Sequence, residues 1–302
     1  MENNQKNSLF HSISDRTIGF ISVLISTFIM GSFGVLVRQA SADSGMIAFS
    51  RSALGCLFLA GCLVVSQQWQ AFRIRISLPL VLSGIFLAFC ILFYSKALKT
   101  TALANAVFLL YLAPLIATIM GSCLLKEKIS AIKTLLILCA FAGLVCLLDF
   151  DFAFTKIATH GKSLALAAAF CYALFIVANR KIDAAIGGFS RAFYQLLISA
   201  LVMLPFIGTV DLPSIYDDRY SLLAIGFFQG FVALTLMIVS LRYLRAYEFA
   251  TISYLEPIIG AAAGYLLFNE TLSWLQVSGG ALILISGFVQ MRFSLEEPER
   301  KE

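Results

Sequence analysis

Charge is scarce in this chain. Only 13% of its 302 residues are Asp, Glu, Lys or Arg, whereas an ordinary soluble domain carries about 25%. Apolar residues make up 60% of the chain, and the mean hydropathy is +0.90. A soluble fold could not bury this much apolar surface, so the composition predicts an integral membrane protein that has the lipid bilayer as its main solvent.

The residues that build metal and disulfide sites are also few or unsuitably spaced. There are two histidines, and the seven cysteines lie inside apolar segments without a C-x-x-C pair. This pattern argues against structural zinc and a disulfide framework, and it suggests that the cysteines are small packing residues. Lys and Arg form no run that would favour nucleic acid. We expect no metal, no cofactor and no nucleic-acid partner.

Long apolar segments dominate the rest of the sequence. A membrane-spanning helix needs about 20 apolar residues, and we identify ten candidate segments: 17–37, 45–66, 76–95, 102–125, 131–149, 162–180, 189–208, 221–241, 247–268 and 274–292. The least distinct break is the third, where only Lys96 and Lys99 intervene. We therefore expect an all-α integral membrane protein with ten transmembrane helices.

The distribution of positive charge predicts the orientation of these helices. If the N-terminus is cytoplasmic, 15 of the 22 Lys and Arg residues fall on the cytoplasmic side. Cytoplasmic loops of membrane proteins carry such an excess. We expect both termini to be cytoplasmic.

One stretch of sequence occurs twice, 143 positions apart. Residues 111–130 read Y-L-A-P-L-I-A-T-I-M-G-S-C-L-L-K-E-K-I-S, and residues 254–273 read Y-L-E-P-I-I-G-A-A-A-G-Y-L-L-F-N-E-T-L-S, with eight identical positions. This offset carries five spans, an odd number, so the two halves would enter the membrane in opposite senses. Secondary transporters use such inverted repeats, because two similar halves can rock around a site at the membrane midplane.

Each half has a proline in its fourth helix and a glutamate thirteen residues later. With the lead-in A-L-K-T-T-A-L-A-N-A at residues 97–106, this pattern resembles the EamA-type proteins of the drug/metabolite transporter superfamily. The resemblance covers about residues 17–292 and implies an inner-membrane carrier, commonly an exporter of amino acids or other small metabolites. We expect a cytoplasmic tail (1–16), two five-helix repeats (17–149 and 162–292), an outer linker (150–161) and a cytoplasmic tail (293–302).

The expected function is secondary active transport in the bacterial inner membrane, with export of a small polar metabolite such as an amino acid by alternating access. Uptake and multidrug efflux are alternatives within the same superfamily. A membrane-embedded enzyme is a distant alternative, because no cluster of catalytic Asp, Glu or His is evident in the sequence. The expected partners are a small-molecule substrate and the lipid bilayer, and the protein would be a monomer or a homodimer.

Glu256 is the most informative single residue. It lies in mid-segment before Pro257, at the position where the first half has Ala113. An ionisable group at that depth is costly and usually faces a cavity or a partner. Glu256 would bind a substrate amine or a coupling proton, or it would form a structural ion pair or a hydrogen bond to a helix end. Arg51 could pair with it or hold a substrate carboxylate, although snorkelling to the outer interface is the favoured interpretation.

Several further residues are candidates for the transport pathway. The polar residues expected to line it are Tyr94, Tyr111, Asn179, Gln195, Gln229 and Tyr254. Pro114 and Pro257 would kink their helices, because proline removes a backbone hydrogen bond. Small residues allow two helices to approach closely, and they recur here as Ala117 with Gly121 and as Gly260 with Gly264. We therefore expect the fourth and ninth segments to pack near the pseudo-two-fold axis.

Overall fold

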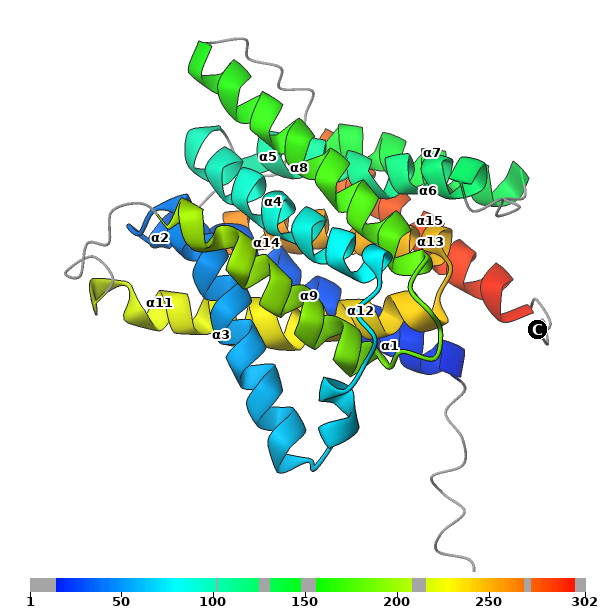
Figure 1. Ribbon diagram of the computed structural model, residues 1–302. Helices are drawn as coiled ribbons and strands as arrows, with labels where there is room; N and C mark the ends of the chain where they lie inside the picture. Colours follow the sequence, from blue (N-terminus) through cyan, green and yellow to red (C-terminus); the bar gives the residue numbers. More distant parts are fainter. Residues whose placement is uncertain are drawn as a thin grey trace, which may run out of the picture.

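Helices account for all the regular secondary structure in the residues that the computed structural model describes, namely 15–101, 103–124, 131–147, 156–207, 216–268 and 273–296 (Figure 1). The first half contains α1 (Asp15–Gly31), α2 (Phe33–Gln39), α3 (Ser44–Val65), η1 (Trp69–Phe72), α4 (Leu78–Thr100), α5 (Leu103–Leu110), α6 (Leu112–Leu124) and α7 (Ala131–Leu147). The second half contains α8 (Lys156–Arg180), α9 (Gly188–Met203), η2 (Leu204–Phe206), α11 (Arg219–Ala224), η3 (Ile225–Ala233), α12 (Leu234–Tyr243), α13 (Ala246–Ser253), α14 (Leu255–Phe268) and α15 (Trp274–Glu296).

Six helical stretches in the described part of the chain are long and apolar enough to cross a membrane. They are Asp15–Gln39, Ser44–Val65, Leu78–Thr100, His160–Arg180, Gly188–Phe206 and Arg219–Tyr243. Large apolar side chains point outward from them, such as Phe28 (69% exposed) and Leu57 (66% exposed). Such a surface suits lipid rather than water. The predicted all-α membrane architecture is therefore confirmed in outline.

The helix boundaries differ from the expected spans at one informative place. The third span was expected to end at residue 95, but α4 continues to Thr100. Lys99 does not end the helix, because its ammonium group donates to the backbone oxygens of Ala40 and Ala42. A lysine whose ammonium group is hydrogen-bonded to a neighbouring turn can remain inside a helix that a lysine at the interface would mark as ended.

The repeat is visible in the helix boundaries themselves. The helix pair α5 and α6 and the pair α13 and α14 begin at positions exactly matched by the 143-residue offset, with single-residue breaks at Tyr111 and Tyr254. Pro114 and Pro257 follow three residues later and lack the amide hydrogen that would bond the carbonyls of Leu110 and Ser253. Both segments are therefore interrupted at the same point relative to their prolines.

The two halves interlock through their first and third segments. Helix α1 packs against α12, and α8 packs against α4, so each half covers part of the other (Figure 1). A glycine lies at each contact: a Cβ on Gly19 would come 2.9 Å from Leu244 Cγ, and one on Gly161 would come 2.7 Å from Thr101 Cβ. Neither glycine leaves room for a larger side chain. The two contacts are related by the repeat.

Candidate substrate-binding site

One basic and one acidic side chain lie inside the helix bundle. Arg51, near the start of α3, is only 6% exposed, and Glu256 lies in the first turn of α14, where it is partly exposed. Their charges act on each other. The only ion pair found among the described residues joins Arg16 to Glu248, so Arg51 and Glu256 do not form a direct ion pair. The guanidinium of Arg51 and the carboxyl group of Glu256 are therefore two separate groups.

Arg51 is held in place by contacts that leave part of its hydrogen-bonding capacity unused. Its guanidinium carbon lies 4.5 Å from the ring centroid of Phe33, and its Nη2 is 3.1 Å from Met30 Sδ. Its Nε has no hydrogen-bond partner. This placement inside the bundle differs from the expected snorkelling to the interface. The burial results from α1 and α2, which fold over the side chain.

A break in the ninth segment places Glu256 at the beginning of a helix. Helix α14 starts at Leu255, and the positive end of the helix dipole favours a negative charge in the first turn. Three tyrosines, one from the α5–α6 break and two from α4 and α8, lie within the electrostatic reach of the carboxylate: Tyr111, Tyr94 and Tyr172. Tyr111 is also close enough to interact with the carboxylate through its hydroxyl.

Tyr172 was not among the residues expected to line the site. Its hydroxyl is 3.5 Å from Met237 Sδ on α12, and its ring stacks on Phe175 with centroids 6.3 Å apart. It occupies the middle of an apolar segment in the same way as Tyr94 does. That position was the available sequence signal, but it is too common to single out one tyrosine.

The two repeat-related tyrosines meet at the helix breaks. The ring centroids of Tyr111 and Tyr254 are 5.9 Å apart, and the side chains are 4% and 0% exposed. Neither hydroxyl makes a standard hydrogen bond. Helix α13 contacts α6, and α14 contacts α5, so the fourth and ninth segments lie against each other.

Other predicted polar residues form hydrogen bonds between helices. Gln195 donates to Ser83 Oγ (2.6 Å) and to Asn179 Oδ1 (2.9 Å), and this links α9, α4 and α8. Gln229 donates to Ile29 O (2.7 Å) and Ser32 Oγ (3.0 Å), at the break between α1 and α2. These hydrogen bonds give Gln195, Asn179 and Gln229 a structural role in this conformation.

Small residues set the helix spacing around Arg51. The closest approach involves Gly230 of η3, where a Cβ would come 1.9 Å from the backbone oxygen of Arg51. Among the predicted packing residues, Ala117 and Gly121 are buried, and Gly260 faces Gly31 of α1 at an ordinary 3.7 Å. The surroundings of Pro114 and Gly264 lie outside the described side chains, whereas Pro257 is buried.

Several of the predicted polar residues carry a buried atom without a hydrogen-bond partner. The buried atoms without a hydrogen-bond partner include Arg51 Nε, Tyr111 Oη, Tyr254 Oη, Gln195 Oε1 and Gln229 Oε1. Each such group costs about 1–3 kcal/mol when it stays unsatisfied. A polar ligand that binds between Arg51, Tyr111 and Glu256 would satisfy part of this set. The arrangement can therefore bind a small molecule through both a cation and an anion.

Comparison with known proteins places this geometry in a family. A crystal structure with a TM-score of 0.74 covers 94% of this chain and 99% of its own chain at 21% identity, so the fold is shared. The pseudopaline exporter CntI of Pseudomonas aeruginosa is 27% identical over 89% of this chain and 94% of its own length. The threonine/homoserine exporter RhtA of Escherichia coli is 26% identical over 75% of this chain and 77% of its own length.

The family model matches each half of the chain separately. The model of the EamA-like transporter family aligns with residues 17–148 and again with residues 159–291. The relatives with names are transporters and exporters rather than enzymes. The chain therefore belongs to the EamA-like transporter family, and it is a multi-pass transporter of the inner (cell) membrane.

Proposed function

We propose that this protein is a secondary active transporter that exports a small polar metabolite with an amino group and a carboxylate, such as an amino acid, by alternating access. The observation that carries the proposal is the separation of buried Arg51 from Glu256. A charged side chain inside the bilayer costs about 2.5–3.5 kcal/mol even on the lowest scales. Two such groups that do not pair directly are best explained by a ligand that bears both opposite charges.

Arg51 and Glu256 bind different groups of the substrate in this proposal. The guanidinium of Arg51 donates to the substrate carboxylate through its planar fork of N–H groups, while Glu256 accepts from the substrate amine. When the amine leaves, a proton takes its place on Glu256, and this exchange couples transport to the proton gradient. Tyr111 supports the carboxylate of Glu256 from the break between α5 and α6.

The proposed topology has ten spans, both termini in the cytoplasm, and two inverted repeats at 17–149 and 162–292. The matching helix breaks and the reciprocal contacts of α1 with α12 and of α8 with α4 support this arrangement. Rocking of the interlocked halves would open the charged site to either side in turn. The export direction is supported by the named exporters among the relatives.

Metabolite profiling of growth medium tests the proposal. Cells that overproduce the protein should accumulate one or a few amino compounds in the medium. Cells that overproduce Glu256→Gln at equal membrane levels should not, because the variant keeps the size of the side chain but loses its charge. Identical media from the two strains, or selective depletion of a compound from the medium, would contradict export through this site.

A further inference from the structure

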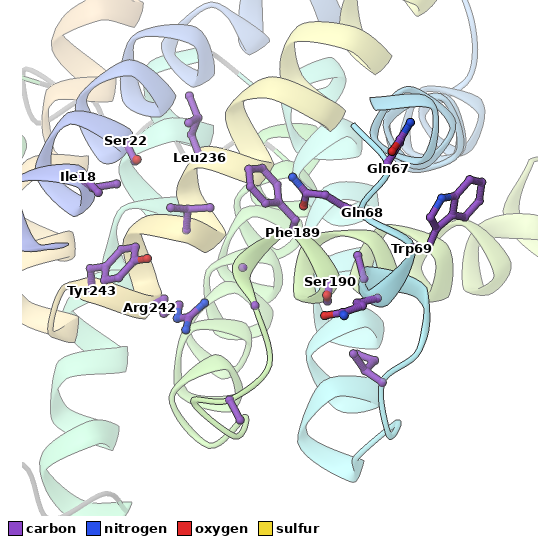
Figure 2. Close-up of a pocket in the computed structure, with 17 residues that line it drawn as sticks. Ile18, Ser22, Gln67, Gln68, Trp69, Phe189, Ser190, Leu236, Arg242 and Tyr243 are labelled. Carbon is purple, nitrogen blue, oxygen red and sulfur yellow. The ribbon is translucent and has the colours of Figure 1, made fainter. Parts of the chain in front are cut away.

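A separate cavity lies at the end of the molecule where α1 begins and α3 and α12 end. Its volume is about 990 Å³, and it is lined by α1, the segment after α3, the turn between α8 and α9, and α12 (Figure 2). Under the proposed topology this end faces the cytoplasm. The cavity therefore lies on the side from which an exported substrate arrives.

Arg242 is the one charged side chain among the described residues that line this cavity. The amides of Gln67, Gln68 and Gln70 and the hydroxyl of Ser190 supply neutral polar groups in the same wall. The guanidinium lies 5.7 Å from the ring centroid of Tyr243 and forms no ion pair with a described carboxylate. The lining thus combines one cation with hydrogen-bonding groups and no acid.

Neighbouring arginines strengthen the positive field but are already engaged. Arg180 and Arg242 both lie within electrostatic reach of Arg191. Arg191 donates to backbone oxygens in the turn after α8, including that of Asp183 at 2.7 Å, and Arg180 donates to Leu244 O at 3.0 Å. Arg242 is consequently the guanidinium of the three that faces the cavity.

The equivalent residue of the first repeat shows how a side chain at this position is held when it forms hydrogen bonds. Lys99 is the counterpart of Arg242, 143 positions earlier, at the end of α4. It donates to the backbone oxygens of Ala40 and Ala42, and Asp218 holds the same turn through Ala42 N. Arg242 lies beside the corresponding turn between α8 and α9, where a Cβ on Gly187 would be 3.9 Å from its Nη1. Arg242 forms no hydrogen bonds to the described residues of this turn that correspond to those of Lys99, which we call a latch.

We propose that Arg242 is the centre of a second binding site, which takes the carboxylate of the substrate on the cytoplasmic side before it reaches Arg51. This inference rests on the proposed function. One face of α1 connects the two sites: Ile18 and Ser22 line the cavity, and Met30, reached in steps of four residues through Ser26, contacts Arg51. Closure of this end would latch Arg242 to the α8–α9 turn, as Lys99 is latched, and release the carboxylate inward.

The protein carries its own reporter for this site. Trp69 lines the cavity, and the second of the two tryptophans is Trp274, exposed at the start of α15. The Trp274→Phe protein, in nanodiscs of phosphatidylcholine, should show a saturating fluorescence change with sodium acetate, compared with sodium chloride at equal ionic strength. Glycinamide, which has an amine but no carboxylate, should give no such change.

Substitutions on this background identify the residue responsible. Arg242→Gln should raise the acetate midpoint about tenfold or more, since hydrogen bonds to charged groups are stronger than those between neutral groups. Arg242→Lys should restore part of the affinity. Arg75→Gln makes the same charge change at an exposed position outside the lining, on the same face, and should leave the midpoint unchanged.

Three results would overturn the inference: the absence of an acetate response, an unchanged midpoint in Arg242→Gln, or a response that requires phosphatidylglycerol in the nanodisc. The last would assign Arg242 to a lipid phosphate. If acetate binds as expected but the growth media of the wild-type and Glu256→Gln strains are identical, the export proposal fails while the anion site stands.

Discussion

Arg51 shows how a charged side chain can be buried in a membrane protein without forming a salt bridge with a described residue. Its charge is buried at 6% exposure and is stabilised by the face of Phe33 and by the field of Glu256. A cation over an aromatic ring gains about 0.5–2 kcal/mol, which offsets only part of the cost of removing the charge from water. The unpartnered Nε leaves a donor for a ligand.

Arg51→Lys should separate the charge of this residue from its shape. Lysine keeps the positive charge but loses the planar fork and the stacking on Phe33. We expect the KM for the exported compound to rise about tenfold with a smaller change in kcat, measured in proteoliposomes. Arg219→Lys is the matched control, because Arg219 also lies over tyrosine rings, at 4.1 and 4.5 Å. Equal effects of the two substitutions would argue against a binding role.

For single residues, the sequence identified which polar side chains lie inside apolar segments, but it did not identify what surrounds them. Glu256, Arg51, Tyr94 and Tyr111 were all named from polar character inside apolar segments, and the structure brings them within electrostatic reach of one another. The same criterion also named Gln195 and Gln229, which instead bond neighbouring helices. Polarity marks a residue that needs a partner, but only the packing shows whether the partner is a helix or a ligand.

The contact between α3 and η3 is the tightest helix approach near the charged site. Hydrogen bonds of π-helical type run through η3 from Ile225 to Ala233, and such stretches often occur at functional sites. Gly55 and Gly230 lie face to face, with the backbone of Arg51 directly opposite Gly230. The absence of side chains there sets the position from which Arg51 reaches inward.

Gly230→Ala should therefore be destabilising and impair transport. A Cβ at this position would come 1.9 Å from Arg51 O, and overpacking of this kind costs about 1–3 kcal/mol. The thermal unfolding temperature in detergent should fall, and transport should fall with it. Gly61→Ala is the control, because its Cβ would meet nothing within 4 Å and alanine favours a helix by about 1 kcal/mol. A Gly230→Ala protein as stable and active as wild type would show that η3 moves aside readily.

Proline positions predicted the disturbed helices but not the full form of the disturbance. A kink was expected at Pro114 and Pro257, whereas each segment is divided at the tyrosine three residues earlier. The missing amide hydrogen explains the location, since it frees the carbonyl one turn before the proline. The glycine contacts of η3 were not predicted, because a glycine in a membrane helix reveals neither which helix it faces nor how closely.

Over the whole molecule, the two halves share their surfaces rather than stand as separate bodies. The first segment of each half packs against the third segment of the other, at Gly19 and at Gly161. Movement of one half must therefore carry part of the other with it. This interlocking supports a concerted rocking motion more than independent movement of single helices.

The proposed inverted topology can be tested in intact cells. In a protein whose seven cysteines have been replaced, a single cysteine at Asp217 should react with an impermeant maleimide from outside. A cysteine at Gln67 should react only after the membrane is permeabilised. Both positions are exposed, so a difference in labelling would report the side of the membrane. Labelling of both positions from the same side would contradict the topology.

The amino-acid order alone was sufficient for the membrane class, the repeat and the family, because hydrophobicity, charge distribution and the paired proline segments are local properties that can be read along the chain. The charged centre depended on the fold: α3 and α14, more than 180 residues apart in sequence, bring Arg51 near Glu256 without joining them. The same holds for the unlatched Arg242 and the latched Lys99, which are equivalent in sequence and differ only in their surroundings. Burial and distance are products of packing, so a pattern can nominate such residues, but only the three-dimensional arrangement distinguishes a paired charge from one that is free to bind.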